Sequence, residues 1–151
     1  MSSPALKRPV SVLVVVHSAS GRILLLERVR PEGFWQSVTG SLEENETARE
    51  AAVRELLEET GFRADGRLID LELVQRFPIA EPWRERFPAD VTHNTEHAFS
   101  LELATTPEPR ISPGEHVGFQ WLPGRDALDI ASSWSDRCAI ELTLARMQPG
   151  G

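Results

Sequence analysis

Several features that mark particular protein classes are scarce in this sequence of 151 residues. It contains one cysteine, Cys138, so no disulfide can form within the chain, which suits a reducing cytosol. The longest apolar run, residues 12–16, is far too short to span a bilayer. The first eight residues lack the apolar segment of a signal peptide. These absences predict a cytoplasmic protein that has no membrane partner.

Positive charge is also scarce. The chain has 16 Lys and Arg against 23 Asp and Glu, which gives a formal net charge of −7. A broad nucleic-acid surface needs clustered cations, so we expect no nucleic-acid partner. An acidic protein can still bind phosphates when metal ions supply the positive charge.

The hydrophobic pattern predicts one domain of strands and helices. The length fits a single domain, expected over residues 7–147, with flexible termini at 1–6 and 148–151. Three prolines in 78–89 predict an irregular surface loop. Strands that lie between an early and a late helix predict an α/β/α sandwich with a mixed sheet. The expected strands are 9–18, 22–29, 34–38, 67–77, 96–104 and 117–122, and the expected helices are 48–60 and 139–147.

The early helix carries local start and stop signals and an unusual set of charges. Thr47 and Glu50 fit a capping box at its start, and Gly61 fits the glycine that follows a helix. Glu55, Glu58 and Glu59 stand at i, i+3 and i+4, so their carboxylates crowd one face. Each like-charged pair costs roughly 0.2–0.5 kcal/mol on an isolated helix.

A divalent cation would remove the repulsion within this acidic cluster. Carboxylate oxygens are the ligands that Mg²⁺ prefers, and Mg²⁺ keeps coordination positions open for water and phosphate. The competing interpretation of three glutamates taken alone is a solvated acidic helix face.

The residues around the cluster form a longer pattern. Gly40 is followed after five residues by Glu46, and after seven more by Arg-Glu-Leu-Leu-Glu-Glu-Thr-Gly-Phe at 54–62. This pattern resembles the complete signature of the Nudix hydrolase family. Its chance occurrence is on the order of 10⁻⁹ per starting position with ordinary residue frequencies. The resemblance implies an α/β/α sandwich and a metal-dependent hydrolase that cuts a diphosphate linkage in a small phosphorylated molecule.

The resemblance also implies a role for each motif residue. Glu55 and Glu59 would be the main ligands of Mg²⁺, with Mn²⁺ as the alternative ion. Glu58 would be a further ligand or would orient the attacking water, and the carbonyl of Gly40 would join the metal shell. Arg54 would pair with a motif glutamate, although a plain surface cation is an alternative. Glu46 would organise the loop.

One carboxylate outside the motif belongs to the same hypothesis. Glu115 follows Ser-Pro-Gly at 112–114 and precedes a strand, where the family places a distant glutamate that completes the metal site or acts as the base. A simple turn carboxylate is the alternative. His97 and His116 are rival bases, because neutral imidazole accepts protons near neutral pH, but a lone histidine is more often structural.

Residues 7–15, 34–40, 94–96 and 133–135 resemble the branch of the family that hydrolyses dihydroneopterin triphosphate in bacterial folate synthesis. This implies release of pyrophosphate and the monophosphate. The loop at 77–87 is shorter than is usual in that branch. A nucleotide-pool hydrolase acting on (d)NTPs such as dATP and a non-catalytic phosphate-binding module are the alternatives. The implied substrate contacts are Lys7, Arg28, Thr39, Trp83 and Ser133.

Several of these substrate contacts have structural alternatives. Lys7 and Arg28 would bind phosphates or be ordinary solvated cations. Thr39 could bond the substrate or only fill a strand. Trp83 could stack on a flat ring or pack on the core. Ser133 precedes a helix, so an N-cap role competes with ligand contact.

Overall fold

A computed structural model describes residues 6–147. The flexible termini expected at 1–6 and 148–151 lie, except for Leu6, outside the described residues. No helix within the described part of the chain is long and apolar enough to cross a membrane.

The fold is built on one mixed sheet of seven strands. Five of them run in the order β3-β2-β1-β6-β5, with β4 paired to β1 and β7 paired to β2. Only β1 and β6 are parallel; the other pairs are antiparallel. The strands are β1 (Val10–Ser18), β2 (Arg22–Arg28), β3 (Trp35–Gln36), β4 (Val38–Ser41), β5 (Ile69–Pro78), β6 (His93–Leu103) and β7 (His116–Pro123).

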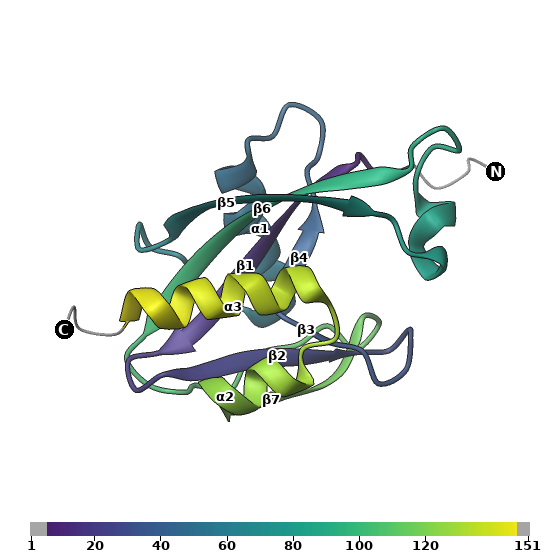
Figure 1. The fold of residues 1–151 in the computed structure, drawn as a ribbon. Helices are drawn as coiled ribbons and strands as arrows, with labels where there is room; N and C mark the ends of the chain where they lie inside the picture. Colours follow the sequence, from purple (N-terminus) through teal and green to yellow (C-terminus); the bar gives the residue numbers. More distant parts are fainter. Residues whose placement is uncertain (1–5, 148–151) are drawn as a thin grey trace.

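Helices cover both faces of this sheet (Figure 1). In the view of Figure 1, α1 (Ala48–Thr60) lies behind the sheet, and α2 (Gly124–Ile130) and α3 (Trp134–Met147) lie in front of it. The predicted α/β/α sandwich with a mixed sheet is therefore confirmed.

The valine-rich run of β1 supplies both cores. Val12, Val14 and Val16 pack beneath α1, whereas Leu13 and Val15 pack on the side of α2 and α3. Successive side chains of a strand point to opposite faces, so a strand covered on both faces is apolar without alternation. This burial explains why the sequence pattern predicted β1 so closely.

One edge of β1 is shared between two partners. Parallel β6 follows β1 along its whole length, from Val10 opposite Thr95 to Ser18 opposite Leu103. On the other edge, β4 pairs with the first half of β1, and β2 meets it only at His17. β4 and β2 therefore occupy different parts of the same edge of β1.

Three parts of the sequence prediction were wrong. The stretch 78–89 is not wholly irregular, because η1, a 3-10 helix, spans Glu81–Arg86. Pro82 lies at its start, where a missing N–H costs no hydrogen bond. The seven-residue helix α2 was not predicted, and α3 begins five residues before the expected start at 139.

Candidate active site

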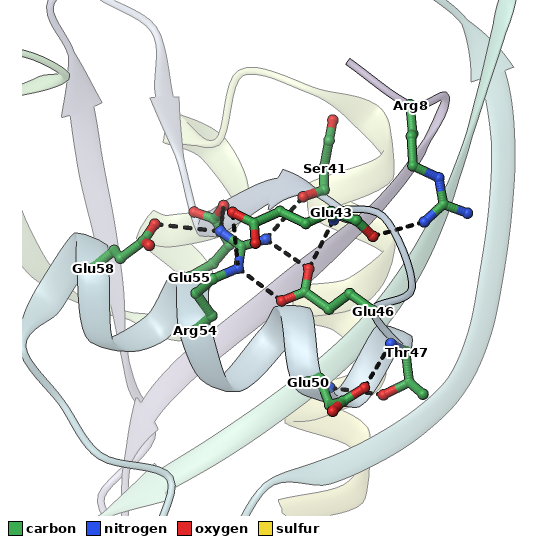
Figure 2. A network of polar contacts seen from close by, with 9 residues as sticks. All are labelled: Arg8, Ser41, Glu43, Glu46, Thr47, Glu50, Arg54, Glu55 and Glu58. Atoms are coloured by element: carbon green, nitrogen blue, oxygen red, sulfur yellow. Dashed lines mark hydrogen bonds and ion pairs between the residues drawn. The ribbon is translucent and has the colours of Figure 1, made fainter. Parts of the chain in front are cut away.

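The acidic cluster lies on a helix whose ends are fixed by local hydrogen bonds. The Thr47 hydroxyl accepts from the Glu50 N–H at 3.1 Å, and the Glu50 carboxylate accepts from the Thr47 N–H at 2.9 Å (Figure 2). At the other end Gly61 is left-handed, with φ of 77°, and its N–H donates to the carbonyl of Leu57. The predicted capping box and terminal glycine are both confirmed.

Arg54 joins the helix to the preceding loop (Figure 2). Its guanidinium donates two hydrogen bonds of 2.8 Å to the carboxylate of Glu46 and a third of 2.8 Å to Glu55. It also donates to the carbonyl of Ser41 at 3.0 Å. The bond from Arg54 lowers the pKa of Glu46 to about 2. The pairing predicted for Arg54 and the loop-organising role predicted for Glu46 are therefore confirmed.

Glu59 is the most confined member of the cluster. Its side chain is 3% exposed, and neither carboxylate oxygen has a hydrogen-bond partner within residues 6–147. Burial, followed by the nearby Glu55 and Glu115 carboxylates, raises the pKa of Glu59 well above its usual value. A buried charge in this state is costly unless a cation or proton compensates it.

Other donors lie close to Glu59. Ligand atoms of Glu59, Glu115 and His116 all lie within 4.8 Å of one another. The His116 Nε2 is 3.7 Å from the Glu59 Oε1, and burial lowers the pKa of His116, which favours the neutral imidazole. The backbone of Gly40 approaches so closely that an added Cβ would overlap the Glu55 carboxylate. A buried carboxylate without partners, beside further oxygen and nitrogen donors, fits a divalent cation.

Acidic and cationic side chains line one cavity. This cavity, of about 450 Å³ and called the phosphate cavity below, is lined by four glutamates and by Lys7 and Arg28. The structure brings together eight of the ten predicted site residues here, namely Lys7, Arg28, Thr39, Gly40, Glu55, Glu58, Glu59 and Glu115.

A second cavity of about 360 Å³ adjoins the first. We call it the ring cavity, because aromatic side chains from β5, η1 and neighbouring loops form much of its wall. It contains the other two predicted residues, Trp83 and Ser133. The two cavities share five lining residues, Lys7, Arg28, Thr39, Gly40 and Arg86.

Comparison with known proteins identifies the fold and the motif. The family model described as NUDIX domain matches residues 7–142. The chain belongs to the Nudix family. It is 42% identical over 145 residues to the dihydroneopterin triphosphate diphosphatase of Escherichia coli (strain K12), covering 93% of this chain and 95% of that protein. The enzyme of the same name from Haemophilus influenzae is 33% identical, covering 91% of this chain and 89% of its own.

A solved structure agrees with this assignment. The Escherichia coli dihydroneopterin triphosphate pyrophosphohydrolase superimposes with a TM-score of 0.89 at 39% identity, covering 95% of this chain and 99% of that chain. The Nudix assignment establishes a hydrolase of phosphoric anhydrides, and members of the family generally use a divalent metal.

Three of the predicted contacts have structural partners in this Nudix fold. The Thr39 hydroxyl donates to the carbonyl of Val12 at 2.8 Å. The Ser133 hydroxyl accepts from the Asp136 N–H at 3.2 Å, as an N-cap does. Trp83 meets Phe34 edge to face, with ring centroids 5.1 Å apart. All three still line the cavities, so their contact with substrate stays a prediction.

Sequence reasoning missed several lining residues. Arg86 borders both cavities, but it lies in the segment that was predicted to be irregular. His116, for which the sequence favours a structural role, lies with its Nε2 3.7 Å from the Glu59 Oε1. Gln36, Asn94 and Glu96 line the ring cavity from strands where a polar residue gives no distinguishing signal.

Proposed function

We propose that this Nudix protein is a Mg²⁺-dependent pyrophosphohydrolase that converts dihydroneopterin triphosphate and water to dihydroneopterin monophosphate and pyrophosphate. The observation that carries the proposal is the pair of joined cavities, one acidic and cationic, the other aromatic. A flat heterocycle suits the ring cavity, and its triphosphate would then enter the phosphate cavity. The full-length similarity to two diphosphatases of that name supports this substrate. We place the reaction in the cytoplasm, as suits a chain whose one cysteine is free and exposed.

Glu55, Glu59 and Glu115 would hold the metal ions, together with the Gly40 carbonyl and with Glu58 as a further ligand or orienting group. Carboxylates and a backbone carbonyl are the oxygen donors that suit Mg²⁺. When bound, a divalent cation neutralises phosphate charge and makes a water molecule more acidic. His116 adds a neutral nitrogen donor that also accommodates Mn²⁺.

Three cations would bind the phosphate oxygens that remain. Burial, and then the charge of Arg86, lowers the pKa of both Lys7 and Arg28. Like charges crowded in this way are costly in the free protein, and a polyanion removes that cost. Arg28 and Arg86 can each grip a phosphate through two N–H groups, whereas Lys7 acts as a point charge.

A carboxylate at the cavity would remove the proton from the attacking water. Burial, and then the neighbouring Glu55, raises the pKa of Glu58, which makes it a better base. The side chain of Glu58 is 57% exposed and lies 3.4 Å from Arg54, so it has room to turn toward the cavity. Glu115, exposed at the cavity edge, is the alternative base. Attack by water at phosphorus breaks one P–O–P bond and releases pyrophosphate.

A substrate panel tests the proposal. Purified protein with Mg²⁺ is assayed for kcat/KM on dihydroneopterin triphosphate, dATP and GTP, and the released phosphate species is identified. We expect the pterin to be the best substrate and pyrophosphate to be the product. Faster hydrolysis of dATP would instead make the protein a nucleotide-pool enzyme. Release of orthophosphate from the pterin would contradict the proposed position of attack.

A further inference from the structure

The ring cavity contains a group of buried polar side chains that the metal chemistry does not use. Gln36 comes from β3, and Asn94 and Glu96 come from β6. Their exposed fractions are 6%, 7% and 5%, yet all three line the cavity. Polar side chains this deeply buried are normally hydrogen-bonded within the protein.

Each of these three side chains has one polar atom that forms no hydrogen bond. Gln36 Nε2, Asn94 Oδ1 and Glu96 Oε1 have no hydrogen-bond partner in the described part of the chain. A buried polar group left in this state destabilises the folded protein, because it has lost its hydrogen bonds to water. The Nδ2 of Asn94 donates to the Ser11 hydroxyl at 2.7 Å, so this side chain is held in place while its oxygen stays free.

A neighbouring acid provides the contrast. Asp136 is also completely buried and lines the same cavity. Its two oxygens accept hydrogen bonds from the Ser37 N–H at 2.7 Å and the Ser37 hydroxyl at 2.8 Å. Asp136 therefore has a structural role that satisfies both oxygens. Glu96 lines the cavity but has no such bond on Oε1, which is free to accept a hydrogen bond from a ligand.

We propose that Glu96, with Asn94 two positions earlier on β6 and Gln36 in the same cavity, binds the edge of a 2-amino-4-oxo-pyrimidine ring and so selects pterins over adenine. This inference rests on the proposed function. The pterin edge presents two adjacent N–H donors, the ring N3–H and the 2-amino group, followed by the 4-oxo acceptor. The charged form of Glu96 accepts both donors at once. Burial raises the pKa of Glu96 to about 8, so the carboxylate predominates above pH 8, and two N–H donors stabilise it further. The unused Nε2–H of Gln36 supplies the N–H that the oxo group needs.

Adenine presents a different edge. Its 6-amino group is a donor, but the adjacent ring nitrogen N1 is an acceptor, which would face a carboxylate oxygen without a proton between them. A site whose buried polar groups must be paired rejects a ring that cannot pair them. Guanine shares the 2-amino-4-oxo pattern, so this edge alone distinguishes adenine and not guanine.

The position of Glu96 in the ring cavity suits the binding of a flat ring whose phosphates reach the phosphate cavity. Glu96 lies opposite Ser11 in the parallel register of β1 and β6, at the end of β1 where β4 also pairs. Phe34, Phe77 and Trp83 line the same cavity and provide apolar contact for a flat ring. The lining residues shared with the phosphate cavity connect this site to the metal ligands.

Binding of the ring without phosphates tests the inference independently of hydrolysis. Dihydroneopterin is titrated into metal-free full-length protein at pH 9, where Glu96 is a carboxylate, and its dissociation constant is measured by fluorescence. Glu96→Gln keeps the side-chain shape but replaces one acceptor with a donor, and we expect binding at least tenfold weaker. Glu102→Gln, an exposed residue of the same strand, is the matched control and should bind as the wild type does. Equal binding by the Glu96→Gln and wild-type proteins would overturn the inference.

A kinetic comparison separates selectivity from general damage. In Glu96→Gln the amide offers one acceptor and one donor, which matches adenine. At pH 9, where the wild-type Glu96 is a carboxylate, we expect the ratio of kcat/KM for dihydroneopterin triphosphate over dATP to fall at least 100-fold in the variant, with dATP turnover kept or increased. An equal fall for both substrates would show a merely structural role and contradict the inference. Gln36→Met, which removes the unused donor while keeping side-chain length, should lower the same ratio.

The two proposals fail in different ways. Wild-type protein that binds dihydroneopterin through Glu96 but does not release pyrophosphate from its triphosphate would overturn the proposed function alone. If the protein hydrolyses the triphosphate efficiently but Glu96→Gln does not change the dissociation constant of dihydroneopterin, the inference alone would be overturned.

Discussion

The burial of Glu59 destabilises the metal-free protein but suits a metal ligand. Its carboxylate is almost fully buried, lacks hydrogen bonds from residues 6–147, and faces the acidic Glu55 and Glu115. The fold gains nothing from this arrangement in the absence of a cation. Such departures from local rules are typical of functional sites.

Substitution of Glu59 should therefore separate stability from activity. Glu59→Gln removes the buried group that must either carry a charge or take up a proton on folding, so we expect the metal-free variant to melt a few degrees above the metal-free wild type. Turnover with Mg²⁺ should fall at least 100-fold, and the stabilisation by Mg²⁺ should be lost. Calorimetry and steady-state kinetics measure both effects, with the exposed loop residue Glu44→Gln as the control. Undiminished turnover would exclude Glu59 as a ligand.

Arg54 is predicted to set metal affinity without touching the metal. It holds Glu55 by one hydrogen bond while two others bind Glu46. Arg54→Lys keeps the charge but loses the paired N–H groups, so we expect Mg²⁺ to bind 10–100-fold more weakly. The Mg²⁺ dependence of the rate measures this change. Arg49→Lys, at an outer position of the same helix, should leave the Mg²⁺ dependence unaltered; an equal change in both variants would contradict the account.

Glu96 makes stability depend on pH. Burial, and then the charge of Asp136, raises the pKa of Glu96 from 4.5 to about 8. The folded protein therefore binds this proton more tightly than the unfolded chain does. The resulting stability is complete below pH about 4.5 and is lost as the pH rises through about 8. Asp136, with its pKa raised from 3.8 to about 6, acts in the same direction at lower pH.

Glu96→Gln should remove the Glu96 part of this pH dependence. Between pH 5 and pH 8.5 we expect the free energy of unfolding to fall by about 2–4 kcal/mol more in the wild type than in the variant. Denaturant unfolding at the two pH values measures the difference. Parallel pH profiles for the two proteins would mean that Glu96 does not carry the raised pKa.

At the scale of elements, the site depends on how closely β4 approaches α1. Gly40 faces Glu55, and an added methyl group would overlap the Glu55 carboxylate. Gly40→Ala should displace Glu55 and lower kcat at least 100-fold, while the fold survives. Gly118→Ala on β7 meets only an ordinary contact and is the control for both kcat and circular dichroism. A normal kcat in Gly40→Ala would mean that catalysis does not depend on the observed position of the Glu55 carboxylate.

The elements differ in how far local sequence predicts them. The bounds of α1 were predicted correctly because its cap, its helix-forming residues and Gly61 are all local signals. The helix α2 has seven residues, begins after Pro123 and has no side-chain cap. It is stabilised by packing of Ala127 against the sheet, which is a tertiary effect. Short elements of this kind leave little trace in the sequence.

At the scale of the whole molecule, the motif residues were found through a resemblance, and the rest of the site depends on chain folding. Parallel pairing of β1 and β6 brings Glu96 beside Ser11, 85 positions earlier in the chain. The backbone N–H of Lys7 donates to the carbonyl of Arg86 in η1 at 2.7 Å. This contact brings the side chains of Lys7 and Arg86 to the same phosphate cavity. Neither contact follows from local periodicity, so Arg86 and Glu96 could not be assigned from the sequence.

We propose that the acidic face of α1 holds divalent cations that bring a diphosphate to Lys7 and Arg28. Anomalous diffraction from crystals soaked with Mn²⁺ and pyrophosphate would locate these ions. We expect Mn²⁺ peaks bounded by the Gly40 carbonyl and the carboxylates of Glu55 and Glu59, with pyrophosphate between the metal and the cations. Density without Mn²⁺ at those carboxylates, while Arg54 still pairs with Glu55, would contradict it.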